Sequence, residues 1–251
     1  MISMPRSAKR IGKKAAIAAF YLLVWQGLAL LVGKSLLLPG PMETMGRLFV
    51  LLGSANAWVA AGLTLLRTLG GYLLGVTFGV LLAVVTANIG FLDELLRPLR
   101  GVIKATPVTS FILLALLWLN SDLVPVCISF LMVLPIIWAN VHEAIGQVDY
   151  RLLEMAQLFG LSKKKQIRTI YIPSVRPQFL AGCTTALGFA WKSGVAAEVI
   201  ALPQKSVGNA LYLSKLTLET TDLFAWTLLV VLLSMLLESL LVHLIGRIRH
   251  D

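Results

Sequence analysis

Charged residues are scarce in this chain of 251 residues: only 14% of positions are Asp, Glu, Lys or Arg, and 58% are hydrophobic. Soluble domains carry about 25% charged residues, so the composition excludes an ordinary soluble domain. Apolar runs long enough to span a bilayer recur along the sequence. The composition therefore predicts an all-α integral membrane protein in which residues 1–251 form a single transmembrane domain.

Acidic residues are especially few, with 12 Asp and Glu against 22 Lys and Arg, and the net charge is +10. Such a charge has two explanations, nucleic-acid binding or an excess of basic residues in the cytoplasmic loops of a membrane protein. The hydrophobic composition favours the second explanation. We therefore expect a membrane-lipid environment and no nucleic-acid partner.

Motifs for catalysis and metal binding are also missing. Cys127 and Cys183 both lie in apolar segments, which argues against a disulfide framework. The chain has no Gly-x-x-x-x-Gly-Lys-Ser/Thr phosphate loop, and His142-Glu143 lacks the second histidine of a zinc-protease helix. We expect no catalytic residue, no metal site and no cofactor bound by the chain itself.

Six apolar segments are long enough to be transmembrane helices. They cover about residues 15–33, 59–87, 101–119, 123–141, 178–200 and 223–245. The basic start leads into an apolar run without a small-residue cleavage site, which predicts an uncleaved anchor. With the N-terminus inside, sixteen basic residues fall in inner segments and four in outer segments. Because Lys and Arg concentrate on the cytoplasmic side, both termini are predicted to lie inside.

Two outer segments contain apolar residues of their own. Leu38-Pro39-Gly40-Pro41 precedes an amphipathic pattern that predicts a helix lying on the outer surface. Residues 201–222 predict either a short helix that shields a pore mouth or a plain tether. In the second span, Gly71, Gly75 and Gly79 share one face, which permits close helix packing either within the chain or against a second copy.

The longest polar interval, residues 142–177, contains helix start and stop signals that predict two short helices. Residues 154–159 are compatible with a helix, and Gly160 suits the left-handed position that ends one. Ser162 predicts a side-chain cap for a second helix, which Pro173 should end. The segment is therefore predicted to be a compact cytoplasmic projection, with Leu161 among its apolar contacts.

These residues resemble the inner-membrane permeases of bacterial ABC importers with the type I fold. The family pattern is Glu-Ala-Ala, three residues, Gly, nine residues, then Ile-x-Leu-Pro. It appears here as Glu154-Met155-Ala156, then Gly160, then Ile170-Tyr171-Ile172-Pro173, with Met and Ile replacing one Ala and the Leu. The outer Leu-Pro-Gly-Pro, residues 64–75 and residues 191–198 are similar to the nitrate/sulfonate/taurine permease branch.

The resemblance implies that the chain is one subunit of a transport complex in the bacterial cytoplasmic (inner) membrane. Two permease copies form the path, two ATP-binding cassette subunits carry ATP and Mg, and an extracytoplasmic binding protein delivers the substrate. The chain itself would be no enzyme. Its cytoplasmic coupling helices, between the fourth and fifth spans, would contact the ATPase through a set of residues in the 142–177 coupling segment: Glu154, Ala156, Gly160, Leu161, Ser162, Ile170 and Pro173.

Four residues are candidates for the pore or the substrate. Lys192 lies well inside the fifth span, where a charged residue usually faces protein or water. It either attracts an anionic substrate or forms a structural ion pair, although Glu198 is six residues away and on another face. Trp191 adjoins it. Arg67 and Glu198 lie near the outer ends of their spans, where they could pair, snorkel or touch substrate.

The substrate is predicted to be a small anion or zwitterion such as a sulfonate, taurine or nitrate. The alternative within the same machinery is a vitamin or a vitamin precursor of the thiamine-pyrimidine type. Two alternatives of a different class are an ion-coupled secondary carrier and an intramembrane enzyme. The first would need a repeat and central acidic residues, and the second a paired nucleophile and base or a metal motif.

Overall fold

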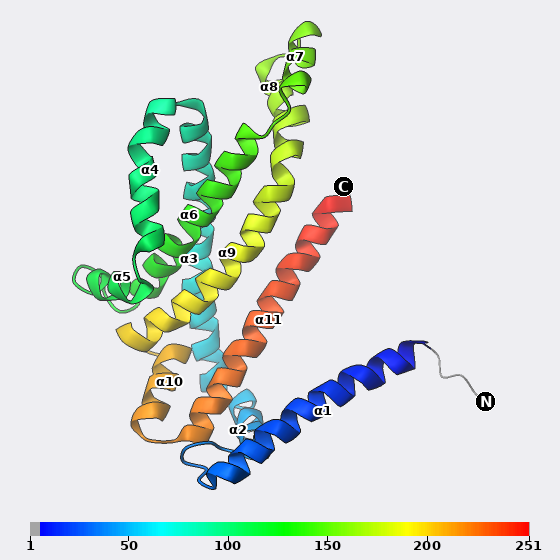
Figure 1. Cartoon of the computed structure of the whole chain (residues 1–251). Coiled ribbons are helices and arrows are strands. Elements are labelled where there is room, and N and C mark those ends of the chain that lie inside the picture. The colour runs from blue at the N-terminus through cyan, green and yellow to red at the C-terminus, as the bar shows by residue number, and fades with distance from the viewer. Residues whose placement is uncertain (1–5, 251) are drawn as a thin grey trace. The chain divides into compact units, whose positions relative to one another are not determined.

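The computed structural model describes the backbone of residues 6–250 and the side chains of residues 15–246 (Figure 1). Every regular element in this part of the chain is helical, which confirms the all-α prediction. Among the residues that the structure describes, four helices are long and apolar enough to cross a membrane, over Ala15–Val32, Ala55–Asn88, Val124–Gly146 and Thr220–Gly246. The total of six spans and the orientation stay predictions. The basic side chains before residue 15 and those of Arg247 and Arg249 lie outside the described side chains.

The helices follow one another with short connections. In chain order they are α1 (Arg6–Val32), α2 (Pro41–Leu52), α3 (Ala55–Asn88), α4 (Gly90–Ala105), α5 (Val108–Ala115), α6 (Val124–Gly146), α7 (Tyr150–Leu158), α8 (Lys163–Gln166), the π-helix η1 (Ile167–Tyr171), α9 (Ile172–Ala201), α10 (Val207–Leu216) and α11 (Thr220–His250).

The third predicted span, residues 101–119, is not one helix, so this prediction was wrong. Helix α4 ends at Ala105, and α5 covers only the eight residues Val108–Ala115. The break lies at Thr106, whose backbone is extended with φ −75° and ψ 129°. Pro107 disfavours the helical conformation for the residue before it, which explains the break. The fourth predicted span, in contrast, extends to Gly146 as α6.

The chain divides into two compact units. One holds the residues up to Trp58 together with Ala210–Val231, and the other holds Val59–Asn209 with the residues from Leu232 onward. In the first unit, Arg47 of α2 forms a bidentate ion pair with Asp222 of α11. Its Nε donates to Oδ1 of Asp222, and its Nη2 donates to Oδ2 at 2.7 Å. The hydrogen bond to Asp222 raises the pKa of Arg47. This pair fixes α2 on the start of α11.

Helix α2 confirms the predicted helix after Leu38-Pro39-Gly40-Pro41. Its buried side includes Thr44 and Leu48, while Met42 and Phe49 are largely exposed. The exposed apolar side fits a helix that lies on a membrane surface. The outer segment 201–222 contains α10, so the plain-tether alternative was wrong.

The second unit has its core where α3, α6 and α9 meet, and α6 and α9 form its most extensive helix pair. A Cβ atom on Gly71 would lie 2.3 Å from the carbonyl oxygen of Val126, and one on Gly79 would lie 2.9 Å from the Cβ of Ile137. The glycine face of α3, which includes Gly75, thus packs against α6 of the same chain. This confirms the within-chain alternative.

Candidate functional site

Helix α7 begins earlier than the sequence pattern predicts. Asp149 precedes the helix, and its side chain accepts a hydrogen bond from the backbone N–H of Arg151 at 2.9 Å. An aspartate at this position satisfies a backbone donor that has no partner within the helix. Glu154 lies on the exposed side of α7, whereas Ala156 is buried. The small side chain of Ala156 therefore lets α7 pack closely against the chain beneath it.

Gly160 ends α7 as predicted, with a left-handed φ of +62°. Its N–H donates to the carbonyl of Gln157 at 2.9 Å, and the N–H of Leu161 donates to the carbonyl of Ala156 at 2.9 Å. These two bonds form a Schellman motif, the hydrogen-bonded turn that satisfies the last carbonyls of a helix. The turn after α7 is consequently fixed by the backbone itself.

Ser162 and Pro173 behave differently from their predicted roles. Ser162 precedes α8, but its hydroxyl makes no capping hydrogen bond, and its carbonyl accepts from the N–H groups of Lys165 and Gln166 instead. Pro173 does not end the second helix: α8 continues through η1 directly into α9.

The π-helix explains how the helix passes Pro173. The N–H of Ile172 donates to the carbonyl of Ile167, five residues back. This wider turn relaxes the contact between the Pro173 ring and the preceding turn, which lets the helix continue without the N–H that proline lacks. Ile170 is buried in this turn. The second helix of the coupling segment is therefore an extension of α9.

Two large apolar side chains are exposed where α7 ends. Leu158 is 88% exposed and Phe159 is 77% exposed, directly before Gly160. In Figure 1, α7 and α8 lie at the end of the α6–α9 pair away from α5. Exposed apolar residues that are held together on a hydrogen-bonded turn are typical of a protein-docking surface.

Arg67 and Glu198, both predicted site residues, form an ion pair. Glu198 is fully buried, and its carboxylate lies 3.4 Å from an Arg67 guanidinium nitrogen. It also accepts hydrogen bonds from the Thr64 hydroxyl at 2.8 Å and the Gly208 N–H at 3.2 Å. Arg67 also donates to Asp122 at 2.5 Å. This cluster joins α3, the α5–α6 connection, α9 and the start of α10.

Thr64 and Asp122 were not singled out from the sequence. Thr64 lies three residues before Arg67, on the same side of a helix, and that spacing was an available signal. Among the described residues, no ion pair involves Lys192, whose side chain is exposed, whereas the neighbouring Trp191 is buried. The structure therefore separates Lys192 from the Arg67–Glu198 pair.

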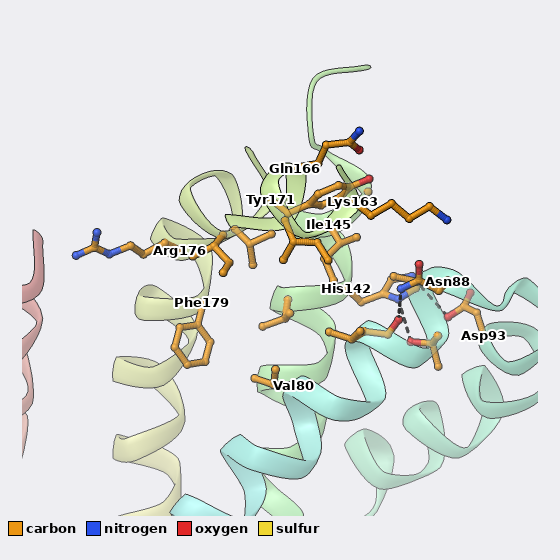
Figure 2. A pocket seen from close by; sticks show the side chains of 18 of the residues that line it. Val80, Asn88, Asp93, His142, Ile145, Lys163, Gln166, Tyr171, Arg176 and Phe179 are labelled. Atoms are coloured by element: carbon orange, nitrogen blue, oxygen red, sulfur yellow. Dashed lines mark hydrogen bonds and ion pairs between the residues drawn. The ribbon is translucent and has the colours of Figure 1, made fainter. Parts of the chain in front are cut away.

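A polar cluster on the wall of a large cavity was also not predicted (Figure 2). Asp93 accepts a hydrogen bond from Arg97 at 2.8 Å and lies within 3.7 Å of Arg100 and 3.6 Å of His142. The Arg97 hydrogen bond, with the nearby charges of His142, Arg97 and Arg100, holds the pKa of Asp93 below its ordinary value despite its burial. His142 in turn lies 3.0 Å from the Thr86 hydroxyl.

The described residues contain no group of three or more His, Cys, Asp or Glu side chains suited to a metal ion. A helical chain with several helices long and apolar enough to span a membrane has the architecture of a multi-pass membrane protein. The sequence profile described as "Binding-protein-dependent transport system inner membrane component" matches residues 75–250, so the chain belongs to this family of ABC importer permeases.

Several curated permeases are similar to the chain over most of its length. The riboflavin transport system permease protein of Chloroflexus aurantiacus is 28% identical, over 88% of this chain and 86% of its own. The nitrate import permease protein of Synechococcus elongatus is 28% identical, over 72% and 68%. A Bacillus subtilis permease protein assigned to aliphatic sulfonates transport is 24% identical, over 92% and 85%.

Membership of the family establishes the coarse role of the chain. It is a transport subunit of the inner membrane, and ATP hydrolysis belongs to separate ATPase subunits. The transporter also includes a binding protein, as the family description states.

Proposed function

We propose that this chain forms half of the translocation path of an ATP-driven importer, paired with a second copy of itself. Two ATPase subunits, which carry ATP and Mg, bind on the cytoplasmic side, and an extracytoplasmic binding protein delivers the solute. The chain itself holds no cofactor. The proposal places six spans in the membrane with both termini inside. Family membership and the sixteen basic residues in inner segments support it.

The observation that carries the coupling part of the proposal is the exposed turn at the end of α7. Leu158 and Phe159 would enter an apolar groove of the ATPase, while Glu154 meets its polar rim. The Schellman motif fixes the turn, and α8 continues through η1 into α9 without a break. A displacement of this turn would therefore move α9 with it. Closure of the ATPase pair could then be transmitted to the membrane spans.

The substrate is proposed to be a small anion or zwitterion such as a sulfonate, taurine or nitrate. Lys192 supports this choice because it is an exposed cation within α9, and a second copy would place it in a shared path. Two of the similar permeases carry names that refer to nitrate and aliphatic sulfonates. The second candidate is a vitamin or vitamin precursor, which the similarity to a riboflavin permease favours. Family membership removes the basis for the carrier and enzyme alternatives.

The test is coupled transport in proteoliposomes. The chain is reconstituted with a co-expressed ATPase subunit and its binding protein, and ATP hydrolysis is measured with and without substrate-loaded binding protein. Glu154→Ala and Gly160→Ala should lower ATPase co-purification and coupled hydrolysis. Lys164→Ala, on the exposed side of the same segment, is the matched control. If assembly and coupled transport survive both substitutions unchanged, the docking proposal is wrong.

A further inference from the structure

One side of the His142 ring contacts a hydroxyl whose own proton is already committed. The Thr86 hydroxyl lies 2.7 Å from the carbonyl oxygen of Leu82, and two oxygens at this distance need a proton between them, so Thr86 donates there. Its oxygen can then only accept further hydrogen bonds. It accepts one from Nε1–H of Trp138 at 2.9 Å, and Nδ1 of His142 lies 3.0 Å away. Nδ1 of His142 therefore carries a proton and donates it to Thr86.

The other ring nitrogen of His142 faces a carboxylate. Nε2 lies 3.6 Å from Oδ1 of Asp93. Oδ2 of Asp93 accepts a hydrogen bond from Arg97 at 2.8 Å, whereas Oδ1 is buried and makes no hydrogen bond in the part of the chain that the structure describes. A neutral imidazole has a proton on only one nitrogen, which here is Nδ1. While His142 is neutral, two acceptors therefore face each other, the Nε2 lone pair and Oδ1 of Asp93.

One added proton removes this mismatch. A cationic imidazole donates from both nitrogens, so Nε2–H can donate to Asp93 while Nδ1–H keeps its hydrogen bond to Thr86. The two atoms need to approach by only about 0.7 Å to reach the usual N–H···O distance of about 2.9 Å. Histidine is the side chain whose charge ordinarily changes between about pH 8 and pH 5. A proton on Nε2 would therefore add a hydrogen bond between α6 and α4.

The other charged and titratable groups around this pair are mostly cations. Glu143, next to His142 on α6, is exposed and accepts a hydrogen bond from Gln147. The groups on the neighbouring elements are Arg97 and Arg100 of α4, Lys163 of α8, Tyr171 of η1 and Arg176 of α9. The cations among them oppose another positive charge nearby. Since Asp93 is the acid paired with His142, proton uptake at His142 depends on Asp93.

We infer that His142 and Asp93 form a proton-binding site, in which uptake of one proton by His142 stabilises the contact between α6 and α4. Both residues line the cavity of about 1100 Å³ between α3, α6 and the start of α9, which gives protons a route to the ring (Figure 2). His142 lies about one turn before α6 ends at Gly146, close to the coupling segment. In the proposed orientation the site would respond to the cytoplasmic pH. The site lies within one chain, so it depends on neither the proposed ATPase contact nor the proposed substrate.

Nitrogen-15 NMR of the full-length chain in lipid bilayers, with labelled histidine, tests the predicted protonation of the ring. His142→Asn identifies the His142 signals, because the asparagine amide can still donate to Thr86. We expect a proton on Nδ1 alone at about pH 8 and on both nitrogens at about pH 5.5. In Asp93→Asn, protonation of both nitrogens should require a lower pH than in wild type.

Thermal unfolding of the purified chain in detergent tests what the proton does. From about pH 8 to about pH 5.5, the unfolding temperature of wild type should rise by about 3–12 °C relative to that of His142→Asn, because a charge-assisted hydrogen bond is gained. The folded chain then holds the proton more tightly than the unfolded chain, so the gain appears as the pH falls. In Asp93→Asn, the further change His142→Asn should have no pH-dependent effect.

The matched control is the other histidine whose side chain the structure describes. His243 of α11 is exposed, so the unfolding temperature of His243→Asn should follow that of wild type between these two pH values.

Three results would overturn the inference. The first is a neutral His142 with its proton on Nε2, because Nε2 could then donate to Asp93 without taking up a proton. The second is a difference in unfolding temperature between wild type and His142→Asn that does not change with pH. The third is protonation of His142 at the same pH in Asp93→Asn as in wild type.

Discussion

The close contact between α3 and α6 can be tested by adding one methyl group at Gly71. An alanine there would place its Cβ 2.3 Å from the carbonyl oxygen of Val126, 2.7 Å from the Cβ of Ser129 and 3.0 Å from the backbone nitrogen of Phe130. Two of these neighbours are backbone atoms, which cannot rotate away. Overpacking of this kind costs about 1–3 kcal/mol, against a gain of about 0.5–1 kcal/mol from replacing a helical glycine.

The adjacent Gly70 provides the control. A Cβ at this position has no heavy atom within 4 Å, so Gly70→Ala gains the helical preference without the clash. The gain from helix propensity is common to both variants, and their difference of about 1–3 kcal/mol isolates the packing contact. Thermal unfolding in detergent, followed by a fluorogenic thiol reagent that reaches the buried Cys183, measures this difference. If Gly71→Ala unfolds at the same temperature as Gly70→Ala, the proposed contact is wrong.

Three further predictions concern the turn and the two polar clusters. Gly160→Ala should reduce ATPase co-purification more than Gly160→Asn, because a left-handed backbone costs most residues about 1–2 kcal/mol and asparagine tolerates it better. Equal amounts of ATPase co-purified with the two variants would contradict this prediction. Arg67→Leu should destabilise the chain by about 3–5 kcal/mol by leaving the Glu198 carboxylate buried and unpaired, and adding Glu198→Gln should restore part of the loss in thermal unfolding. If the double variant is no more stable than Arg67→Leu alone, the ion pair is not the cause. The pKa of Asp93 is lowered from 3.8 in the folded chain, so the contribution of Asp93 to stability is complete above this pH and is lost as the pH falls through the folded-state pKa. Asp93→Asn should therefore unfold at a lower temperature than wild type at neutral pH, and the two unfolding temperatures should converge in acid. A difference in unfolding temperature that stays constant with pH would refute the assignment.

Features set by local rules could be predicted from the sequence. The left-handed Gly160 follows from the helical pattern before it, and the helix after Pro41 follows from the amphipathic spacing and the proline start. The helical content follows from the apolar runs. In each case a few neighbouring residues determine the conformation, so one sequence is enough.

Features set by contacts between distant segments could not be predicted. Pro173 is a helix breaker by local rules, but the π-turn over Ile167–Tyr171 carries the helix past it. The approach of Asp93 to His142 joins α4 to α6, and the Thr64–Glu198 hydrogen bond joins α3 to α9. No periodicity within one helix indicates which residue of another helix it will meet.

The most direct test of the central claim is the affinity of the ATPase subunit for variants of the exposed turn. Leu158→Ser with Phe159→Ser removes the two apolar side chains and leaves the Schellman turn in place. Leu117→Ser, at a residue that is 70% exposed near α5, is the control. The account predicts that the double variant binds the co-expressed ATPase at least about tenfold more weakly while the control binds as wild type does. Unchanged affinity of the double variant would contradict the assignment of this turn as the ATPase contact.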